Sequence, residues 1–397
     1  MQPSTSYLPT RNHGLDTLRA CAISLVFMYH YMVFVSHQQT FGWLSEIGWA
    51  GVDLFFVLSG YLIGNQVFKG LAQGHRLSLS SFYWRRAWRT LPVFWLVLAA
   101  YFFFRAYLGG KAPPPLWRFL TFTQNWGLKP GTAFSHAWSL CIEEQFYLIL
   151  PLLLVVVAWC NQRCRFKLRR EHGWLLLGSL LALGVVARCV LWSRYGLEAF
   201  GEVNSYYPNV YYSTLCRFDE FLPGIALALL KNFHPTIWQR LTAHGQKIML
   251  AGLLTCAALF YISYHFYYID GYGYGFFMSA FGYSLLAFAF ALMVLAALSP
   301  TSSLSQWRIP GAQSLALWSY SIYLTHKPLA YWIQMQSKTL AWSPAVLLAV
   351  ITLACLVLGA LLYHLLELPC LRLRERWSAD LHQPSHTASQ PTIGQSI

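Results

Sequence analysis

Ten apolar stretches follow one another along this chain of 397 residues, each close to the length that crosses a bilayer. A helix rises ~1.5 Å per residue, so about 20 apolar residues span the hydrocarbon core. Only 11% of the residues are charged, whereas a soluble domain carries about 25%. We therefore expect an all-α, polytopic integral membrane protein. Its ten predicted transmembrane helices are 15–36, 48–68, 91–108, 137–160, 173–192, 213–230, 248–266, 276–298, 312–333 and 344–366.

Lys and Arg are concentrated in every second connection between these stretches. The positive-inside rule places the basic connections in the cytoplasm. Both termini are then cytoplasmic, and the cytoplasmic (inner) membrane is the expected location. The net charge of +14 follows from this topology. Nucleic-acid binding is not expected, because it needs a basic stripe on a polar surface.

The chain divides into one bundle, residues 1–376, and a polar tail, 377–397. The tail is rich in Ser, Thr, Gln, His and Pro, and we expect it to be disordered. The connection 109–136 contains three consecutive prolines and two tryptophans. We expect it to form an ordered lid on the outer surface.

Several ionisable residues lie inside the apolar stretches, where a charged group costs roughly 2.5–3.5 kcal/mol on insertion scales. Counting the helical rise from the cytoplasmic side places His30, Glu143 and His326 at about 21–22 Å in a ~30 Å core. Three further residues lie within a few ångströms of that level: Asp53, Arg217 and Asp219. This coincidence across five helices predicts a polar site in the outer half of the membrane.

Structural interpretations remain open for these groups. A lone intramembrane histidine can simply bond a neighbouring helix, and Asp53 can be an interfacial residue. Arg105 and Arg188 reach a similar depth, but we interpret them as structural because long side chains can snorkel outward. Glu144 points about 100° away from Glu143 on a helix. Only one of the two is expected to face the site, while the other can pair with an arginine.

A second cluster precedes the third apolar stretch and contains Arg85, Arg86 and Arg89. Positive-inside residues need no ligand, so a topological role is one interpretation. The functional interpretation is that Arg86 and Arg89, three residues apart, share a helix face. Two guanidinium groups on one face can clamp a phosphate.

Short motifs throughout the chain resemble those of the membrane acyltransferase-3 family. In "LDTLRACAISLVFMYHY" an arginine, Arg19, is followed by ten residues and then His30, as in the family's opening span. The segment "AWSLCIEEQFYLILP" is similar to its Ser-Leu-x-x-Glu-Glu-Gln-Phe-Tyr-Leu motif and places Ser139, Glu143 and Glu144. Other matching segments are "GVDLFFVLSGYLIG", "FYWRRAWRTLP", "RFDEFLPGIALAL", "SYSIYLTHKPL" and "ELPCLR", and the resemblance runs from residue 15 to about 372. Thr17 and Ala20 replace glycines that are common in the family, which removes no reactive group.

The resemblance implies transfer of an acyl group, usually acetyl from acetyl-CoA, to a hydroxyl of a glycan or another acceptor. We expect His30 to act as the general base and Glu143 to orient its imidazole. Arg85, Arg86 and Arg89 are expected to hold the CoA phosphates, with the pantetheine arm passing Arg19. The supporting residues of this prediction are Arg19, Asp53, Ser139, Glu144, Arg217, Asp219, Ser321, Tyr323 and His326, of which Tyr323 or Ser321 could donate to the oxyanion. No metal is expected.

A proton-coupled membrane transporter is the alternative function, because a proton relay uses the same kinds of intramembrane residue. The sequence shows no inverted repeat and no matching pair of broken helices, which transporters commonly contain. An acyl-His intermediate also remains open.

Overall fold

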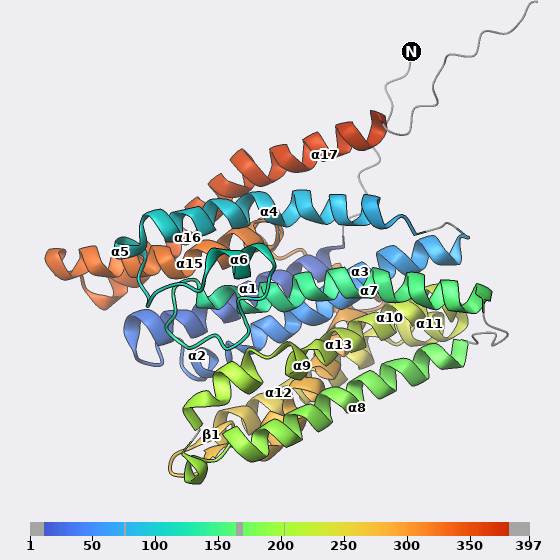
Figure 1. Cartoon of the computed structure of the whole chain (residues 1–397), viewed down its shortest axis with the longest axis horizontal. Coiled ribbons are helices and arrows are strands. Elements are labelled where there is room, and N and C mark those ends of the chain that lie inside the picture. The colour runs from blue at the N-terminus through green and yellow to red at the C-terminus, as the bar shows by residue number, and fades with distance from the viewer. Residues whose placement is uncertain (1–11, 75–76, 164–169, 202, 381–397) are drawn as a thin grey trace, which may run out of the picture.

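The computed structural model describes residues 12–74, 77–163, 170–201 and 203–380. Long helices lie side by side and form one bundle (Figure 1). Among these described residues, seven helical segments are long and apolar enough to cross a membrane: His13–Ser36, Ala50–Ala72, Ser135–Val157, Glu171–Tyr195, Gly245–Phe266, Met278–Leu298 and Pro344–Arg376. The protein is therefore an all-α, multi-pass membrane protein.

Each of the ten predicted stretches coincides with helix. The long helices are α1 (His13–Tyr31), α3 (Ala50–Ala72), α4 (Leu79–Phe103), α7 (Trp138–Arg163), α8 (Arg170–Tyr195), α10 (Leu222–Phe233), α12 (Gly245–Phe266), α13 (Tyr283–Leu298), α15 (Ala312–Leu340), α16 (Pro344–Leu362) and α17 (Leu368–Asp380). Three of the ten stretches, those on α4, α10 and α15, are absent from the seven apolar spans. The count of ten crossings and the orientation of the termini therefore stay predictions.

The sixth predicted stretch is a broken helix. It divides into α9 (Thr214–Arg217), the 3₁₀ turn η6 (Phe218–Phe221) and α10. Pro223 lies in the first turn of α10, where its missing N–H leaves no helical bond unmade. The break brings three charged residues, Arg217, Asp219 and Glu220, into the buried interior.

The remaining elements are short. They are η1 (Met32–Ser36), α2 (Trp43–Ile47), α5 (Arg105–Leu108), α6 (Leu116–Leu120), η2 (Ser135–Ala137), η3 (Glu198–Phe200), η4 (Val203–Ser205), η5 (Tyr207–Tyr211), α11 (Pro235–Thr242), β1 (Tyr268–Ile269), β2 (Gly273–Tyr274), η7 (Met278–Gly282), α14 (Ser303–Gln306) and η8 (Tyr363–Glu367). The antiparallel pair β1–β2 closes the connection between α12 and α13. The connection 109–136 is ordered, with Phe119 and Phe134 buried against the bundle.

Close backbone contact holds α3 against α10 at the centre of the bundle. A Cβ on Gly60 would lie 2.2 Å from the carbonyl oxygen of Phe221, and one on Gly224 would lie 2.2 Å from that of Val57. Only glycine fits at these two positions, because a larger side chain would force the helices apart. The contact fixes the face of α3 that carries the residues of the candidate site.

Helix α17 extends beyond the boundary predicted at residue 376, since it continues to Asp380. It packs along α4 and η8. The rest of the predicted tail, 381–397, lies outside the described residues.

Candidate active site

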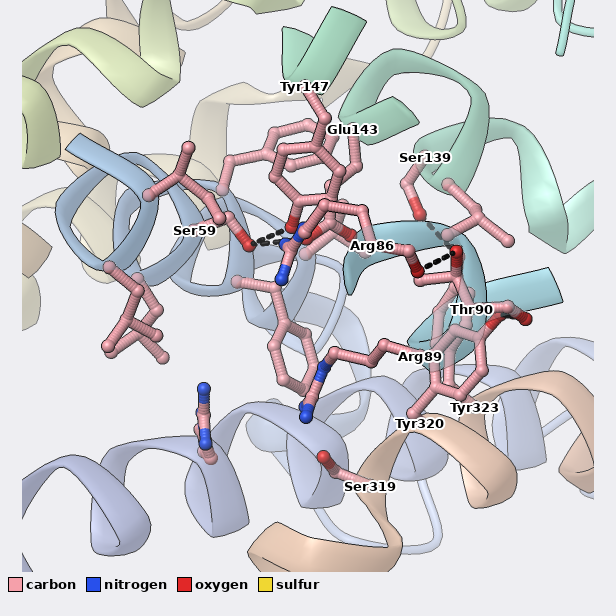
Figure 2. Close-up of a pocket in the computed structure, with 18 of the residues that line it drawn as sticks. Ser59, Arg86, Arg89, Thr90, Ser139, Glu143, Tyr147, Ser319, Tyr320 and Tyr323 are labelled. Atoms are coloured by element: carbon pink, nitrogen blue, oxygen red, sulfur yellow. Dashed lines mark hydrogen bonds between the residues drawn. The ribbon is translucent and has the colours of Figure 1, made fainter. Parts of the chain in front are cut away.

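A cavity of about 340 Å³ opens between α1, α3, α4, α7, α15 and α17. Four arginines line it, and we call it the arginine cavity: Arg19, Arg86, Arg89 and Arg374. Glu143 is the carboxylate in the same lining. Figure 2 shows Arg86 and Arg89 on one side of this space, with Ser59, Glu143 and Tyr147 nearby. Four guanidinium groups against one carboxylate make the cavity suited to an anionic ligand.

Helix α4 directs two of its three clustered arginines into this cavity. Arg86 and Arg89 are three residues apart and share a face, as the sequence indicated. The Arg86 guanidinium lies 3.9 Å from the centroid of the Tyr147 ring, which holds it in a cation–π contact. Arg85 is exposed, and its Nη2 donates to Ser81 Oγ over 2.9 Å. Arg85 therefore lies outside the cavity lining.

Glu143 accepts hydrogen bonds from the hydroxyls of Ser59 and Tyr147. Tyr147 lies one turn further along α7, and Ser59 comes from α3. Glu143 thus has partners other than His30, the residue that it was expected to orient. Glu144 points elsewhere, as the helical rotation requires: it lines a different cavity between α4 and α7, together with Arg86.

A second cavity, of about 270 Å³, contains His30. We call it the histidine cavity. Its lining is mostly aromatic and contains no Asp, Glu, Lys or Arg: Val26, Tyr29, His30, Val33, Phe34, Trp49, Val52, Pro130, Gly131, Ser135, His136, Trp138, Tyr207, Tyr211, Tyr212 and Tyr323. The Lys327 ammonium lies just behind it and donates to Ser135 Oγ over 3.0 Å. His30 and Glu143 therefore line different cavities, which corrects the expectation of a single shared pocket. The physical reason is that equal depth along two helices does not bring their side chains onto facing sides.

His30 is paired with His326 on α15. The His30 Nδ1 and His326 Nε2 atoms lie 2.7 Å apart, and the two rings are stacked. The His326 Nδ1 atom lies 3.0 Å from the carbonyl oxygen of Ile322. A carbonyl can only accept, so His326 Nδ1 carries the hydrogen and neutral His326 presents a lone pair on Nε2. His30 Nδ1 then donates, which leaves His30 Nε2 as the basic nitrogen.

A third histidine, His136, was missed by the sequence analysis. It lines the histidine cavity from η2, and its ring centroid lies 6.3 Å from that of His30 and 5.4 Å from that of His326. Its Nε2 atom lies 3.1 Å from the carbonyl oxygen of Leu324. Pro328 has no N–H to bond this carbonyl four residues earlier, so His136 donates in its place. The proline inside "SYSIYLTHKPL" is the sequence signal that α15 leaves a carbonyl open to a partner.

Asp53, Arg217 and Asp219 form buried ion pairs instead of lining either of the two cavities. Arg217 bonds Asp53 over 3.1 Å and also pairs with Glu220. Arg188 bonds Asp219 over 2.6 Å. All five side chains are fully buried. None of them lines the arginine or histidine cavity.

These ion pairs connect α3, α8, α9 and η6 behind the aromatic wall of the histidine cavity. The Arg217 guanidinium lies 4.8 Å from the ring centroid of Tyr211 and 5.2 Å from that of Trp138. Arg188 was interpreted as structural, and it points inward instead of snorkelling outward because Asp219 provides a partner inside the bundle. The network holds the wall in place through packed charges and rings.

Tyr323 lines both cavities, and its hydroxyl links α15 to the start of α7. It donates to the carbonyl oxygen of His136, and the Ser139 Oγ atom lies 2.5 Å away (Figure 2). Because the single Tyr323 proton goes to that carbonyl, Ser139 is the donor to Tyr323. Ser321 is buried, bonds Glu367 over 3.4 Å and lines neither cavity.

Among residues 12–74, 77–163, 170–201 and 203–380, no group of three or more His, Cys, Asp or Glu side chains could hold a metal ion.

A family model described as an acyltransferase domain matches residues 12–364. The chain belongs to this acyltransferase family. The match includes every residue of the histidine cavity and all of the arginine cavity except Arg374.

Relatives carry names that agree with this family. The chain is 30% identical over 401 residues to the putative peptidoglycan O-acetyltransferase YrhL of Bacillus subtilis, covering 91% of this chain and 56% of the relative. It is 28% identical over 351 residues to the peptidoglycan O-acetyltransferase OatA of Listeria monocytogenes, covering 83% and 51%. The chain thus spans about half the length of these curated relatives. No solved structure matches it.

Proposed function

We propose that this protein is a membrane O-acyltransferase that moves an acetyl group from acetyl-CoA to a hydroxyl of a glycan acceptor. The observation that carries the proposal is the hydrogen bond from His30 Nδ1 to His326 Nε2, which leaves His30 Nε2 as a basic nitrogen. This histidine lines a mostly aromatic cavity that adjoins a cavity lined by four arginines. The family membership and the names of the relatives support O-acetyl transfer.

The arginine cavity suits the donor. CoA carries several phosphate groups, and guanidinium groups bind phosphate through charge-assisted, often bidentate hydrogen bonds. Arg86 and Arg89 lie near the start of α4, and Arg19 lies near the start of α1. The thioester end then points deeper, toward Ser139 and Tyr323. If the basic end of the bundle is cytoplasmic, as the positive-inside rule indicates, the donor enters from the compartment in which acyl-CoA is made.

The histidine cavity suits the acceptor. Its mostly aromatic lining, which contains no Asp, Glu, Lys or Arg, fits an uncharged sugar ring, whose apolar face can pack on Trp and Tyr side chains. An acceptor hydroxyl placed against His30 Nε2 would lose its proton to that nitrogen as its oxygen attacks the thioester carbonyl. The C–O bond forms, the C–S bond breaks, and the imidazolium returns the proton to the departing CoA thiolate. His326 keeps the base in the correct tautomer throughout.

The test is transfer of label from isotope-labelled acetyl-CoA to glycan or lipid-linked sugar in membranes that contain the protein. His30→Ala should abolish transfer with normal membrane insertion, because general-base catalysis contributes roughly 10²–10⁴-fold. His265→Ala is the matched control, since His265 is exposed on α12 and lines neither cavity. Full activity of His30→Ala would reject the assignment. Ion flux without labelled product would select the transporter alternative.

A further inference from the structure

The arginine and histidine cavities meet at two side chains. Of the described residues, Val52 on α3 and Tyr323 on α15 line both. Both are largely buried, with 6% and 8% of their surface exposed. These two side chains therefore form the boundary between the cavities.

Hydrogen bonds hold the Tyr323 side of this boundary in place. The chain of donors runs from Ser139 to Tyr323 and on to the carbonyl oxygen of His136. The Tyr323 ring centroid lies 5.8 Å from that of His136 and 6.0 Å from that of His326. The Tyr323 ring is held at its hydroxyl and packs against two imidazoles, so it cannot turn aside without breaking these hydrogen bonds.

We propose that Val52 and Tyr323 form a constriction that sets which acyl group passes from the donor to the acceptor. This inference rests on the proposed function. If acyl-CoA occupies the arginine cavity and His30 activates a hydroxyl in the histidine cavity, the acyl carbon must reach the boundary between the two. An acetyl group adds a single methyl beyond the carbonyl, whereas longer chains must fit further methylenes between a valine and a fixed aromatic ring. Val52 and Tyr323 are therefore specificity-determining residues for acyl length.

The same constriction limits water. Hydrolysis competes with transfer: a water oxygen attacks the thioester carbonyl, the C–S bond breaks, and acetate, free CoA and a proton result. The Tyr323 side chain, held at the boundary, separates water in the histidine cavity from a thioester in the arginine cavity. Tyr323 thus favours transfer to the acceptor over loss of the acetyl group.

The first test compares acetyl-, propionyl- and butyryl-CoA as donors to the same acceptor. Val52→Ala should raise the butyryl-to-acetyl ratio of kcat/KM at least tenfold. Val57→Ala is the matched control, because Val57 is a buried valine on the same helix that lines neither cavity. Val52→Leu narrows the passage and should lower acetyl transfer and abolish propionyl transfer. An unchanged donor profile in both Val52 variants would overturn the proposal.

The second test follows release of free CoA without acceptor. Tyr323→Phe keeps the ring but removes its hydroxyl, and it should raise acceptor-independent hydrolysis of acetyl-CoA several-fold relative to transfer. Tyr101→Phe is the control, since the buried Tyr101 hydroxyl has no partner among the described residues. Equal hydrolysis in Tyr323→Phe and the unaltered protein would refute the water barrier. If the unaltered protein transfers no label from acetyl-CoA, the proposed function fails instead, so the two failures are distinguishable.

Discussion

His30 donates a hydrogen bond from Nδ1 to His326 Nε2 across 2.7 Å, and this pair joins α1 to α15. The direction of the bond follows from the Ile322 carbonyl, which accepts from the other nitrogen of His326. In the proposed mechanism, neutral His326 takes the orienting role that a carboxylate has beside many catalytic histidines. An uncharged partner suits a cavity whose lining contains no carboxylate.

His326→Leu should lower kcat by about tenfold or more, because His30 would lose the acceptor that fixes its tautomer. His326→Gln restores an acceptor oxygen and should recover part of that loss. The measurement is kcat and KM for labelled acetyl transfer in membranes, with protein amounts matched. Equal activities of the Leu and Gln variants would contradict the orienting role, because a packing defect alone would not distinguish them in this way.

Arg86→Ala together with Arg89→Ala should raise the apparent KM for acetyl-CoA by about tenfold or more. A hydrogen bond to a charged group contributes about 1.5–3 kcal/mol, and 1.4 kcal/mol is tenfold in affinity. Arg85→Ala is the control, because Arg85 is exposed on the same helix and lies outside the cavity. The sequence predicted that all three arginines bind the donor. A rise in KM for Arg85→Ala equal to that of the double variant would show that charge near the entrance, not the cavity, binds the phosphates.

The positions of the long helices could be predicted because the length of each apolar stretch can be counted in the sequence. The stretch 213–230 was predicted as one transmembrane helix, although the charged residues and Pro223 that interrupt it mark where the helix breaks. The exact ends of the helices were harder to predict. Helix α17 continues through polar residues up to Asp380, where hydropathy gives no signal.

The site was predicted in part, for a specific physical reason. Depth along a helix follows from counting residues, and it correctly brought His30 and His326 to one level. Rotation about the helix axis and the packing of neighbours do not follow from counting, so Glu143 was assigned to the wrong partner. Arg188 points inward because Asp219, on a different helix, stabilises it there. His136 lies one residue before the predicted transmembrane stretch 137–160, so it was not counted among the ionisable residues inside the membrane.

Arg374→Ala should raise the KM for acetyl-CoA while leaving kcat nearly unchanged. Arg374 lies on α17, beyond residue 364, where the family match ends, yet it lines the arginine cavity. Its loss removes one of four guanidinium groups from the arginine cavity and nothing from the histidine cavity. Arg372→Ala is the matched control, because Arg372 is exposed on the same helix and lines neither cavity. A KM that is unchanged in Arg374→Ala but raised in Arg372→Ala would show that α17 presents a different face to the donor.

Arg217→Leu should destabilise the bundle by about 3–5 kcal/mol, because it leaves Asp53 and Glu220 buried without their cation. Thermal unfolding in detergent measures the loss, with Arg105→Leu as an exposed control. A triple variant that also carries Asp53→Leu and Glu220→Leu removes every charge of this group and should recover much of the lost stability. A triple variant no more stable than Arg217→Leu would show that the two unpaired carboxylates are not the cause of the loss.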